Sequence, residues 1–162
     1  MIFIVLGTQK FQFNRLLKKI DTLIQNGKIT EDVVAQIGHS DYKPVNFKYS
    51  YFLDNIEFNY LIEKCSLLIT HSGVGTIITG LKKKKSIIVC PRLSKYGEHV
   101  DDHQIEIAED FFKVGYVLPC FDIDKLENKI EQSYHFNFLD YHSKKNQIIN
   151  TIRTFINKDE KF

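Results

Sequence analysis

Short apolar segments and amphipathic segments alternate along this chain of 162 residues. Apolar runs predict strands over Ile2–Leu6, Val33–Ile37, Lys48–Leu53, Leu67–Thr70, Ser86–Cys90 and Tyr116–Leu118. Apolar residues at helical spacing predict helices from Leu16 to Gly27 and over Asn55–Lys64, Ile77–Lys84, His103–Val114, Lys125–Ser133 and Tyr141–Phe155. We therefore predict one α/β domain over residues 1–162, a Rossmann-like doubly wound parallel sheet, with a C-terminal helical segment at 136–162.

The segment after the fourth predicted strand is the most informative about function. It runs His71-Ser72-Gly73-Val74-Gly75-Thr76 and then continues as a helix. A strand that turns through glycines into a helix leaves backbone N–H groups unpaired at the positive end of the helix dipole, which is a site for phosphate. The alternative is that the glycines only make the turn, and the motif by itself leaves both open.

Polar residues gather at the carboxyl ends of the predicted strands, where ligands bind in open α/β sheets. They are Thr8 and Gln9, Gly38 and His39, His71 and Ser72, and Arg92. A long polar segment from Arg92 leads to the triplet Asp102-His103-Gln104. Carboxylate and amide groups suit sugar hydroxyls, so a nucleotide diphosphate on the glycine turn with its head group near Asp102 and Gln104 fits this layout. The alternative is that Asp102 only caps its helix.

Three further side chains at this edge allow a chemical and a structural interpretation. His71 either donates to a diphosphate, which would raise its pKa, or bonds a loop carbonyl. Glu98 and His99 are either acid/base groups or part of a solvated loop. Nothing in their spacing indicates catalysis, so a solvated loop is the expectation.

Composition and charge exclude several classes. The chain is 43% hydrophobic and 26% charged with a net charge of +2, which does not favour nucleic-acid binding. The apolar run at Ile2–Leu6 is too short for a signal peptide or a membrane span. Cys65, Cys90 and Cys120 lack metal-binding spacing, so we expect free thiols and no metal site. The run Lys82–Lys85 is either an exposed helix end or a contact with anionic lipid.

Three segments together resemble a known family. They are Thr70–Thr76, Ser86–Arg92, and Asp102-His103-Gln104 with Ala108-Glu109. They are similar to the C-terminal, donor-binding lobe of GT-B glycosyltransferases of the family 28 type, and in particular to Alg13-like proteins. The segments Gly7–Phe11 and Pro91–His99 resemble the bacterial branch, the PssE-like galactosyltransferase subunits of capsule and exopolysaccharide synthesis.

The resemblance implies a single GT-B lobe that binds a UDP-sugar as substrate, with no cofactor and no metal. It implies donor contacts from Gly7, Thr8, His71, Ser72, Gly73, Gly75, Thr76, Asp102, His103 and Gln104, with His71 as a stabiliser of the leaving group. Related lobes have an acidic residue for the ribose three positions after the threonine of the glycine motif. Here that position is Thr79, which puts ribose recognition in doubt.

A GT-B active site lies between two lobes, and this chain has residues for one. The resemblance therefore implies a membrane-anchored Alg14-like or PssD-like partner that supplies the acceptor lobe and the catalytic base. The complex would work at the cytoplasmic face of the cell membrane, on a lipid-linked saccharide acceptor, with galactose the favoured sugar. The alternative is a non-catalytic accessory subunit that stabilises the partner. An NAD-dependent oxidoreductase is disfavoured, because Gly7-Thr8-Gln9 lacks the dinucleotide-binding fingerprint.

Overall fold

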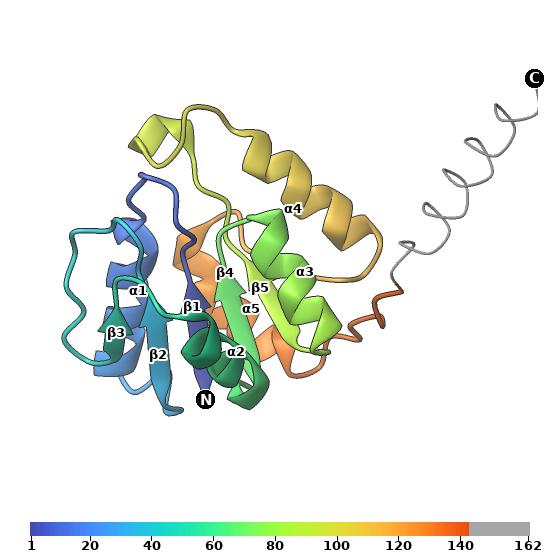
Figure 1. The fold of residues 1–162 in the computed structure, drawn as a ribbon, viewed down its shortest axis with the longest axis horizontal. Helices are drawn as coiled ribbons and strands as arrows, with labels where there is room; N and C mark the ends of the chain where they lie inside the picture. Colours follow the sequence, from blue (N-terminus) through green and yellow to red (C-terminus); the bar gives the residue numbers. More distant parts are fainter. Residues whose placement is uncertain (143–162) are drawn as a thin grey trace, which may run out of the picture.

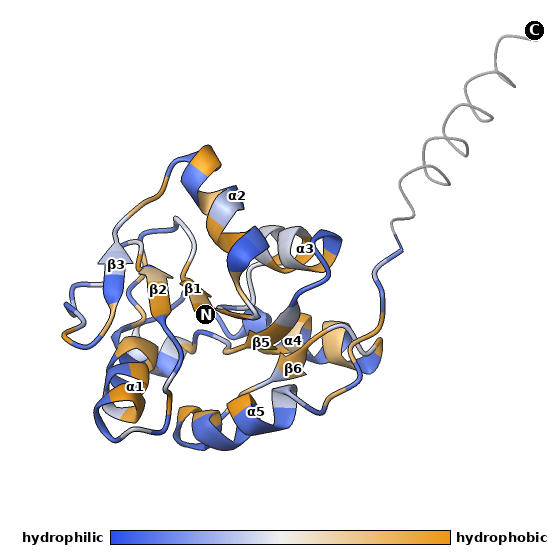
Figure 2. Ribbon diagram, turned by 90° about the horizontal axis from the view of Figure 1, so that it is seen from below, coloured by the Kyte–Doolittle hydropathy of each residue, from blue (hydrophilic) through white to orange (hydrophobic). Residues whose placement is uncertain are grey.

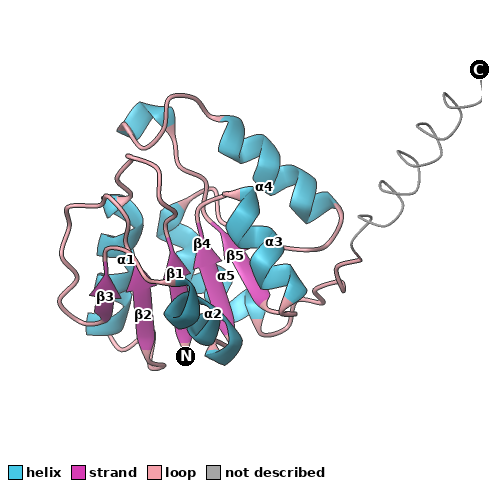
Figure 3. Ribbon diagram, in the orientation of Figure 1, coloured by secondary structure: helices cyan, strands magenta, loops and turns pink. Residues whose placement is uncertain are grey.

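The centre of the molecule is a sheet of six parallel strands (Figures 1 and 3). In the computed structural model, which describes residues 1–142, these strands are β1 (Ile2–Val5), β2 (Val33–Gln36), β3 (Lys48–Ser50), β4 (Leu67–Thr70), β5 (Ser86–Val89) and β6 (Leu118–Pro119). The helices are α1 (Asn14–Gln25), α2 (Asn55–Lys64), α3 (Val74–Lys82), α4 (His103–Lys113) and α5 (Leu126–Ser133), with short 3₁₀ turns η1 (Ser94–Tyr96) and η2 (Ile123–Lys125). The predicted α/β class with a single parallel sheet is confirmed.

The strand order fixes where loops meet. It is β3-β2-β1-β4-β5-β6, so the chain winds outward from β1 to β3 and then crosses back to β4 on the other side of β1. Ile2 accordingly pairs with Val33 on one side and with Leu67 on the other. In such sheets the winding direction changes between the two central strands, and their carboxyl ends border a crevice that binds ligands. Here that crevice lies between the ends of β1 and β4.

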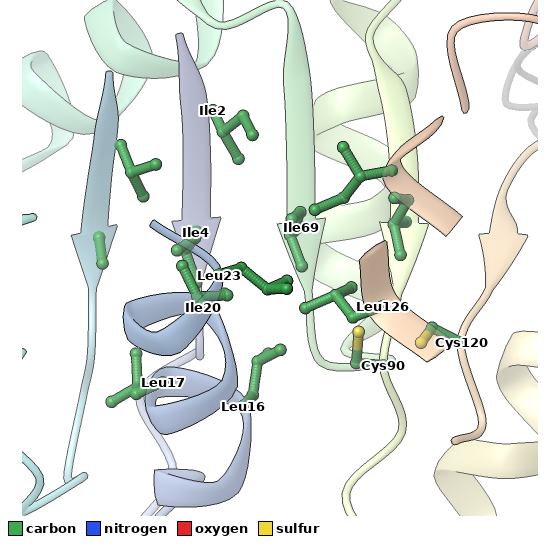
Figure 4. Close-up of a cluster of buried hydrophobic side chains, with 14 of the residues drawn as sticks. Ile2, Ile4, Leu16, Leu17, Ile20, Leu23, Ile69, Cys90, Cys120 and Leu126 are labelled. Carbon is green, nitrogen blue, oxygen red and sulfur yellow. The ribbon is translucent and has the colours of Figure 1, made fainter. Parts of the chain in front are cut away.

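Two hydrophobic layers cover the sheet, one on each face (Figure 2). Alternate residues of β1 point to opposite faces, so Ile2 and Ile4 join one layer while Phe3 and Val5 join the other. The first layer packs against α1 and α5, as Figure 4 shows for Leu16, Ile20 and Leu126. The second packs against α2, α3 and α4. Burial on both faces explains why β1 is apolar at every position and why β4 and β5 are apolar except at Thr70 and Ser86.

Element ends differ from the sequence prediction by a few residues. The largest difference among the helices is at α3, which begins at Val74 rather than Ile77, so Gly75 lies inside its first turn. The predicted strand Lys48–Leu53 is shorter, because the chain turns away after Ser50 toward α2. The predicted strand Tyr116–Leu118 is displaced to Leu118–Pro119.

The predicted C-terminal helical segment at 136–162 is described only in part. Residues 136–142 are irregular rather than helical. Residues 143–162, which include most of the predicted helix Tyr141–Phe155, lie outside the described residues. Within residues 1–142, no helix combines the length and the apolar character needed to cross a membrane.

Most of the lysine run makes contacts within the protein. Lys83 forms an ion pair with Glu63. Lys85 Nζ donates to the carbonyl oxygens of Glu63 at 2.7 Å and Cys65 at 3.0 Å, and Lys84 Nζ lies 3.4 Å from Asp140 Oδ1. The contacts of Lys83 and Lys85 connect the end of α3 to the end of α2, and that of Lys84 reaches the segment after α5. A lipid contact of this run stays an untested prediction.

Asp21 is a buried carboxylate that holds the connection from β2 to β3 against α1. Its side chain is only 4% exposed and accepts hydrogen bonds from Tyr42 Oη at 2.6 Å, from the Val45 amide at 2.9 Å and from the Asn46 amide at 2.8 Å. Burial opposes ionisation, but the hydrogen bonds from Tyr42, Val45 and Asn46 together outweigh it and lower the pKa of Asp21.

Asp21→Asn should therefore lower the free energy of unfolding by about 1–3 kcal/mol at pH 7, because an amide cannot accept all three bonds. A carboxyl with a lowered folded pKa stabilises above its unfolded pKa of about 3.9 and loses that contribution as the pH falls through the folded value. The difference between wild type and variant in urea unfolding should shrink below pH 4. Exposed Asp32→Asn is the matched control. A constant difference from pH 7 to pH 3 would contradict the assignment.

Candidate functional site

A cavity of about 290 Å³ opens at the carboxyl ends of β1 and β2, beside the first turn of α3. Its lining residues come from four stretches of the chain that the fold brings together: Val5, Gly7, Thr8, Gln36, Leu53, Asn55, Phe58, Gly75, Thr76 and Thr79. Four of them, Gly7, Thr8, Gly75 and Thr76, are site residues that the sequence predicted. The position agrees with the ligand crevice of doubly wound sheets.

A larger hollow of about 540 Å³ lies away from the strand ends, between α1 and the turns η1 and η2. Two of its three basic side chains already contact carboxylates: Arg15 binds Glu98 at 2.9 Å, and Lys19 lies 3.5 Å from Asp124. Of the two, the smaller cavity is the better candidate, because it combines the switch point with unpaired backbone donors.

The first turn of α3 offers those donors. The amide of Ile77 donates to the carbonyl of Gly73 at 3.1 Å, and the Gly73 amide donates to the carbonyl of His71 at 2.5 Å. Val74, Gly75 and Thr76 lie between Gly73 and Ile77, and their amides have no hydrogen-bond partner among the described residues. Gly73 at the N-cap provides no side-chain acceptor. Three N–H groups thus remain free where the helix dipole is positive, which favours an anion.

A side chain is absent at Gly7, Gly73 and Gly75 for different physical reasons. A Cβ on Gly75 would have no neighbour within 4 Å, so the position is open toward the cavity. A Cβ on Gly7 would lie 2.5 Å from His71 Cε1, and one on Gly73 would lie 2.4 Å from His71 Nε2. The imidazole ring therefore fills the space between these two glycines. Gly7 and Gly73 are needed to pack His71, a reason that the sequence analysis did not consider.

His71 is a buried neutral side chain in this structure. Its Nδ1 lies 3.3 Å from the Val5 carbonyl oxygen and 3.3 Å from Thr70 Oγ1. Burial, followed by the positive charge of Arg92, lowers the pKa of His71 to about 4. A carbonyl oxygen only accepts, so the neighbouring Nδ1 is the nitrogen that bears the proton, and Nε2 is left as an acceptor. The adjacent Ser72 is fully buried, and its Oγ has no partner among the described residues.

The triplet at the start of α4 lies apart from the cavity. Asp102 Oδ1 accepts from the Ser94 amide at 2.8 Å, so its side chain closes the preceding loop and does not cap α4. His103 is exposed, with Nδ1 3.0 Å from Glu106 Oε2. Gln104 is buried, and its Oε1 accepts from the Arg92 amide at 3.0 Å. The roles predicted for these three toward a sugar remain predictions.

Most of the segment after Arg92 is exposed, as predicted for a solvated loop, but Glu98 is an exception. Glu98 is 1% exposed, and its carboxylate accepts hydrogen bonds from Nε and Nη2 of Arg15, at 3.0 and 2.9 Å. It also accepts from the Leu93 amide at 3.0 Å. The expectation of a solvated Glu98 is wrong, because Arg15, more than eighty positions earlier, faces it across the fold. His99 contacts Asp101 at 3.0 Å and packs on the Phe11 ring.

Sequence reasoning missed part of the cavity wall. Gln36, Leu53, Asn55 and Phe58 were not among the candidates. Gln36 is a polar residue at the end of an otherwise apolar strand, which is a signal that could have identified it. The other three follow β3 and give no local signal. No group of three His, Cys, Asp or Glu side chains within residues 1–142 could hold a metal ion.

Comparison with known proteins links this geometry to a family. The glycosyltransferase family 28 C-terminal domain matches residues 1–158. The chain is 33% identical over 148 residues to the UDP-N-acetylglucosamine transferase subunit ALG13 of Candida albicans, covering 85% of this chain and 47% of the relative. It is 35% identical over 78 residues to the Saccharomyces cerevisiae protein of the same name, covering 48% of this chain and 35% of the relative. The chain thus spans less than half the length of these curated relatives.

Solved structures share the fold. An NMR structure of ALG13 superposes with a TM-score of 0.60 at 18% identity, covering 94% of both chains. The MurG structure from Acinetobacter baumannii gives a TM-score of 0.55 at 16% identity, covering 80% of this chain and 40% of that one. At these identities the likeness is one of fold. The sheet of this protein is therefore arranged like a lobe of such glycosyltransferases.

Gly73→Ala should lower the free energy of unfolding by about 1–3 kcal/mol, because the new methyl group meets the His71 ring. Gly75→Ala is the matched control; we expect it to leave stability unchanged or to raise it by up to about 1 kcal/mol, since alanine favours a helix. Urea unfolding measures both. In a His71→Ala background the cost of Gly73→Ala should become smaller, and an equal cost in both backgrounds would refute the packing argument.

His71 should also make stability depend on pH. A histidine with a lowered folded pKa stabilises above its unfolded pKa of about 6.5, and that contribution is lost as the pH falls toward 4. We expect the free energy of unfolding to fall by up to about 1.4 kcal/mol per pH unit in this window. The slope should be reduced in His71→Gln. NMR titration of the ring should give a value near 4, and a pKa at or above 6.5 would disprove the assignment.

Proposed function

This chain belongs to the glycosyltransferase family 28 C-terminal domain family, and from that premise we propose that it is the donor-binding subunit of a two-component glycosyltransferase. It would bind a UDP-sugar, whose hexosyl group passes to a lipid-linked acceptor. The observation that supports this most directly is the set of three unpaired amides, Val74 to Thr76, at the cavity between the ends of β1 and α3. A diphosphate matches those donors in charge and geometry.

The cavity has room and partners for the nucleoside. Leu53 and Phe58 provide apolar wall, and the side-chain amides of Asn55 and Gln36 provide polar groups beside it. Thr79 stands where related lobes have an acidic residue, and its Oγ1 donates to the Gly75 carbonyl at 2.8 Å. The hydroxyl oxygen keeps lone pairs for a ribose hydroxyl, a weaker contact than a carboxylate would give.

In the proposed reaction the acceptor hydroxyl attacks the anomeric carbon, the bond from that carbon to the diphosphate breaks, and UDP leaves with the electron pair. The acceptor proton passes to a base, which we place on the partner subunit. The free amides of α3 stabilise the charge that develops on the departing diphosphate. His71 would donate to it only after protonation at Nε2, which a nearby dianion favours by raising the pKa of the ring.

A partner subunit follows from the same premise. We propose a membrane-anchored, Alg14-like or PssD-like acceptor lobe that docks over the carboxyl edge and recruits this chain to the cytoplasmic face of the membrane. The printed names of the curated relatives describe subunits. Apolar side chains that a partner could cover are exposed here: Tyr51 and Phe52 follow β3, Val74 begins α3, and Val100 lies in the loop before α4.

The proposal also includes the identity of the sugar and the pathway that uses it. Transfer of galactose in capsular or exopolysaccharide synthesis rests on the resemblance of Gly7–Phe11 and Pro91–His99 to bacterial subunits. The curated relatives are named for UDP-N-acetylglucosamine. Both donors therefore belong in the assay. A non-catalytic accessory role is the second candidate, favoured by the absence of the acidic residue at Thr79.

Titration of the isolated chain with UDP tests donor binding. We expect the NMR signals of the Val74, Gly75 and Thr76 amides to shift, and Gly75→Val to weaken UDP binding by about tenfold or more, because its side chain enters the space that the diphosphate needs. The variant should fold, since that space is empty in the wild type. Thr22→Val, on α1 at the larger hollow, is the control and should bind UDP normally. No shift of these amides at millimolar UDP would favour the accessory role.

A further inference from the structure

Within residues 1–142, Arg92 is the largest side chain that is completely buried, at 0% exposure. It follows β5, and its guanidinium reaches past β4 to the segment after β1. There Nη2 donates to the carbonyl oxygens of Leu6 at 2.6 Å and Phe11 at 3.0 Å. The two carbonyls enclose Gly7 and Thr8, which line the 290 Å³ cavity. Arg92 thus lies behind one wall of the candidate site.

The guanidinium of Arg92 lies 5.9 Å from the centre of the Phe13 ring but has no bonded counterion within the described residues. No carboxylate is hydrogen-bonded to it, and its Nε and Nη1 have no partner there. Glu98 is the carboxylate that acts on it at longer range, but both Glu98 oxygens already bind Arg15. Burial lowers the pKa of Arg92 to about 10, so the side chain remains charged at neutral pH. A buried cation without a counterion is unfavourable unless something else balances it.

The surroundings indicate what balances it. The charge of Arg92 acts on His71, whose ring lies between Gly7 and Gly73. Ser72, next to that ring, also has a buried oxygen without a partner. The free amides of α3 follow Ser72 and Gly73 directly in the chain. The Arg92 cation, the Ser72 hydroxyl and the free amides favour negative charge in the cavity, and the phosphates of a nucleotide supply it.

We propose that Arg92 is a positioning residue for the donor: it fixes the Leu6–Phe11 wall, and its uncompensated charge selects a ligand with a diphosphate over the same nucleoside without one. This inference rests on the proposed function. It deepens that function by assigning the charge preference of the site to a residue that lines no part of the cavity.

The test compares UDP, UMP and uridine as ligands of the full chain, by calorimetry or NMR. In Arg92→Gln we expect affinity for UDP to fall by about tenfold or more and affinity for UMP to fall less, while uridine binds as in wild type. Arg92→Lys keeps the charge and should retain most of the preference for UDP. Arg15→Lys, at the ion pair with Glu98, is the control for disturbance of the neighbouring loop.

If the role of Arg92 is purely structural, Arg92→Gln should weaken the binding of UDP, UMP and uridine alike. That result would overturn the inference and leave the donor-binding proposal intact. If Arg92→Gln does not fold, the wild type gives the answer through its Arg92 Nε–H signal. We expect this NMR signal to shift with UDP and not with uridine, and an unchanged signal at saturating UDP would also overturn the inference. If wild type binds UDP no better than uridine, both this inference and the donor-binding proposal fail.

Discussion

The ring of His71 fills the gap between Gly7 and Gly73, where β1 and β4 end side by side. Parallel pairing brings the two strand ends together, and a ring of this size fits between them only because neither glycine has a Cβ. The ring then determines the course of both loops. It supports the turn at Gly73 from which α3 begins, and so it sets the direction in which the free amides of Val74 to Thr76 face. Desolvation in this position keeps the ring neutral.

Two buried charged side chains at the same edge, Glu98 and Arg92, have different kinds of partner. Glu98 is compensated by a two-point contact with Arg15, which attaches the loop after β5 to α1. Arg92 is satisfied only through Nη2, by two carbonyl oxygens. The first arrangement is a structural ion pair. The second leaves a positive potential at the end of the sheet, in an environment where water screens it weakly.

The carboxyl edge is therefore divided into two regions with different properties. On the side of α2 and α3 is a cavity with backbone donors and small side chains. On the other side is the loop from Arg92 to Asp102, which is mostly exposed but buries Glu98 and is closed by the contact between Asp102 and Ser94. The backbone of Arg92 connects this loop to Gln104 at the start of α4.

The amino-acid sequence by itself determined the class of fold and the existence of the glycine turn. A strand such as Ile2–Val5 is apolar at every position because both faces of the sheet are covered, and that pattern is local. A helix after the glycine turn is equally local, although the sequence placed its start at Ile77 and the structure at Val74. Tertiary structure alone decided which distant groups meet. Glu98 is a buried acceptor because Arg15 faces it, and Gln104 is buried because it binds the Arg92 amide. Arg92, after Pro91, resembles a loop residue in sequence; strand order places its side chain beneath the site, because β4 lies between β5 and β1.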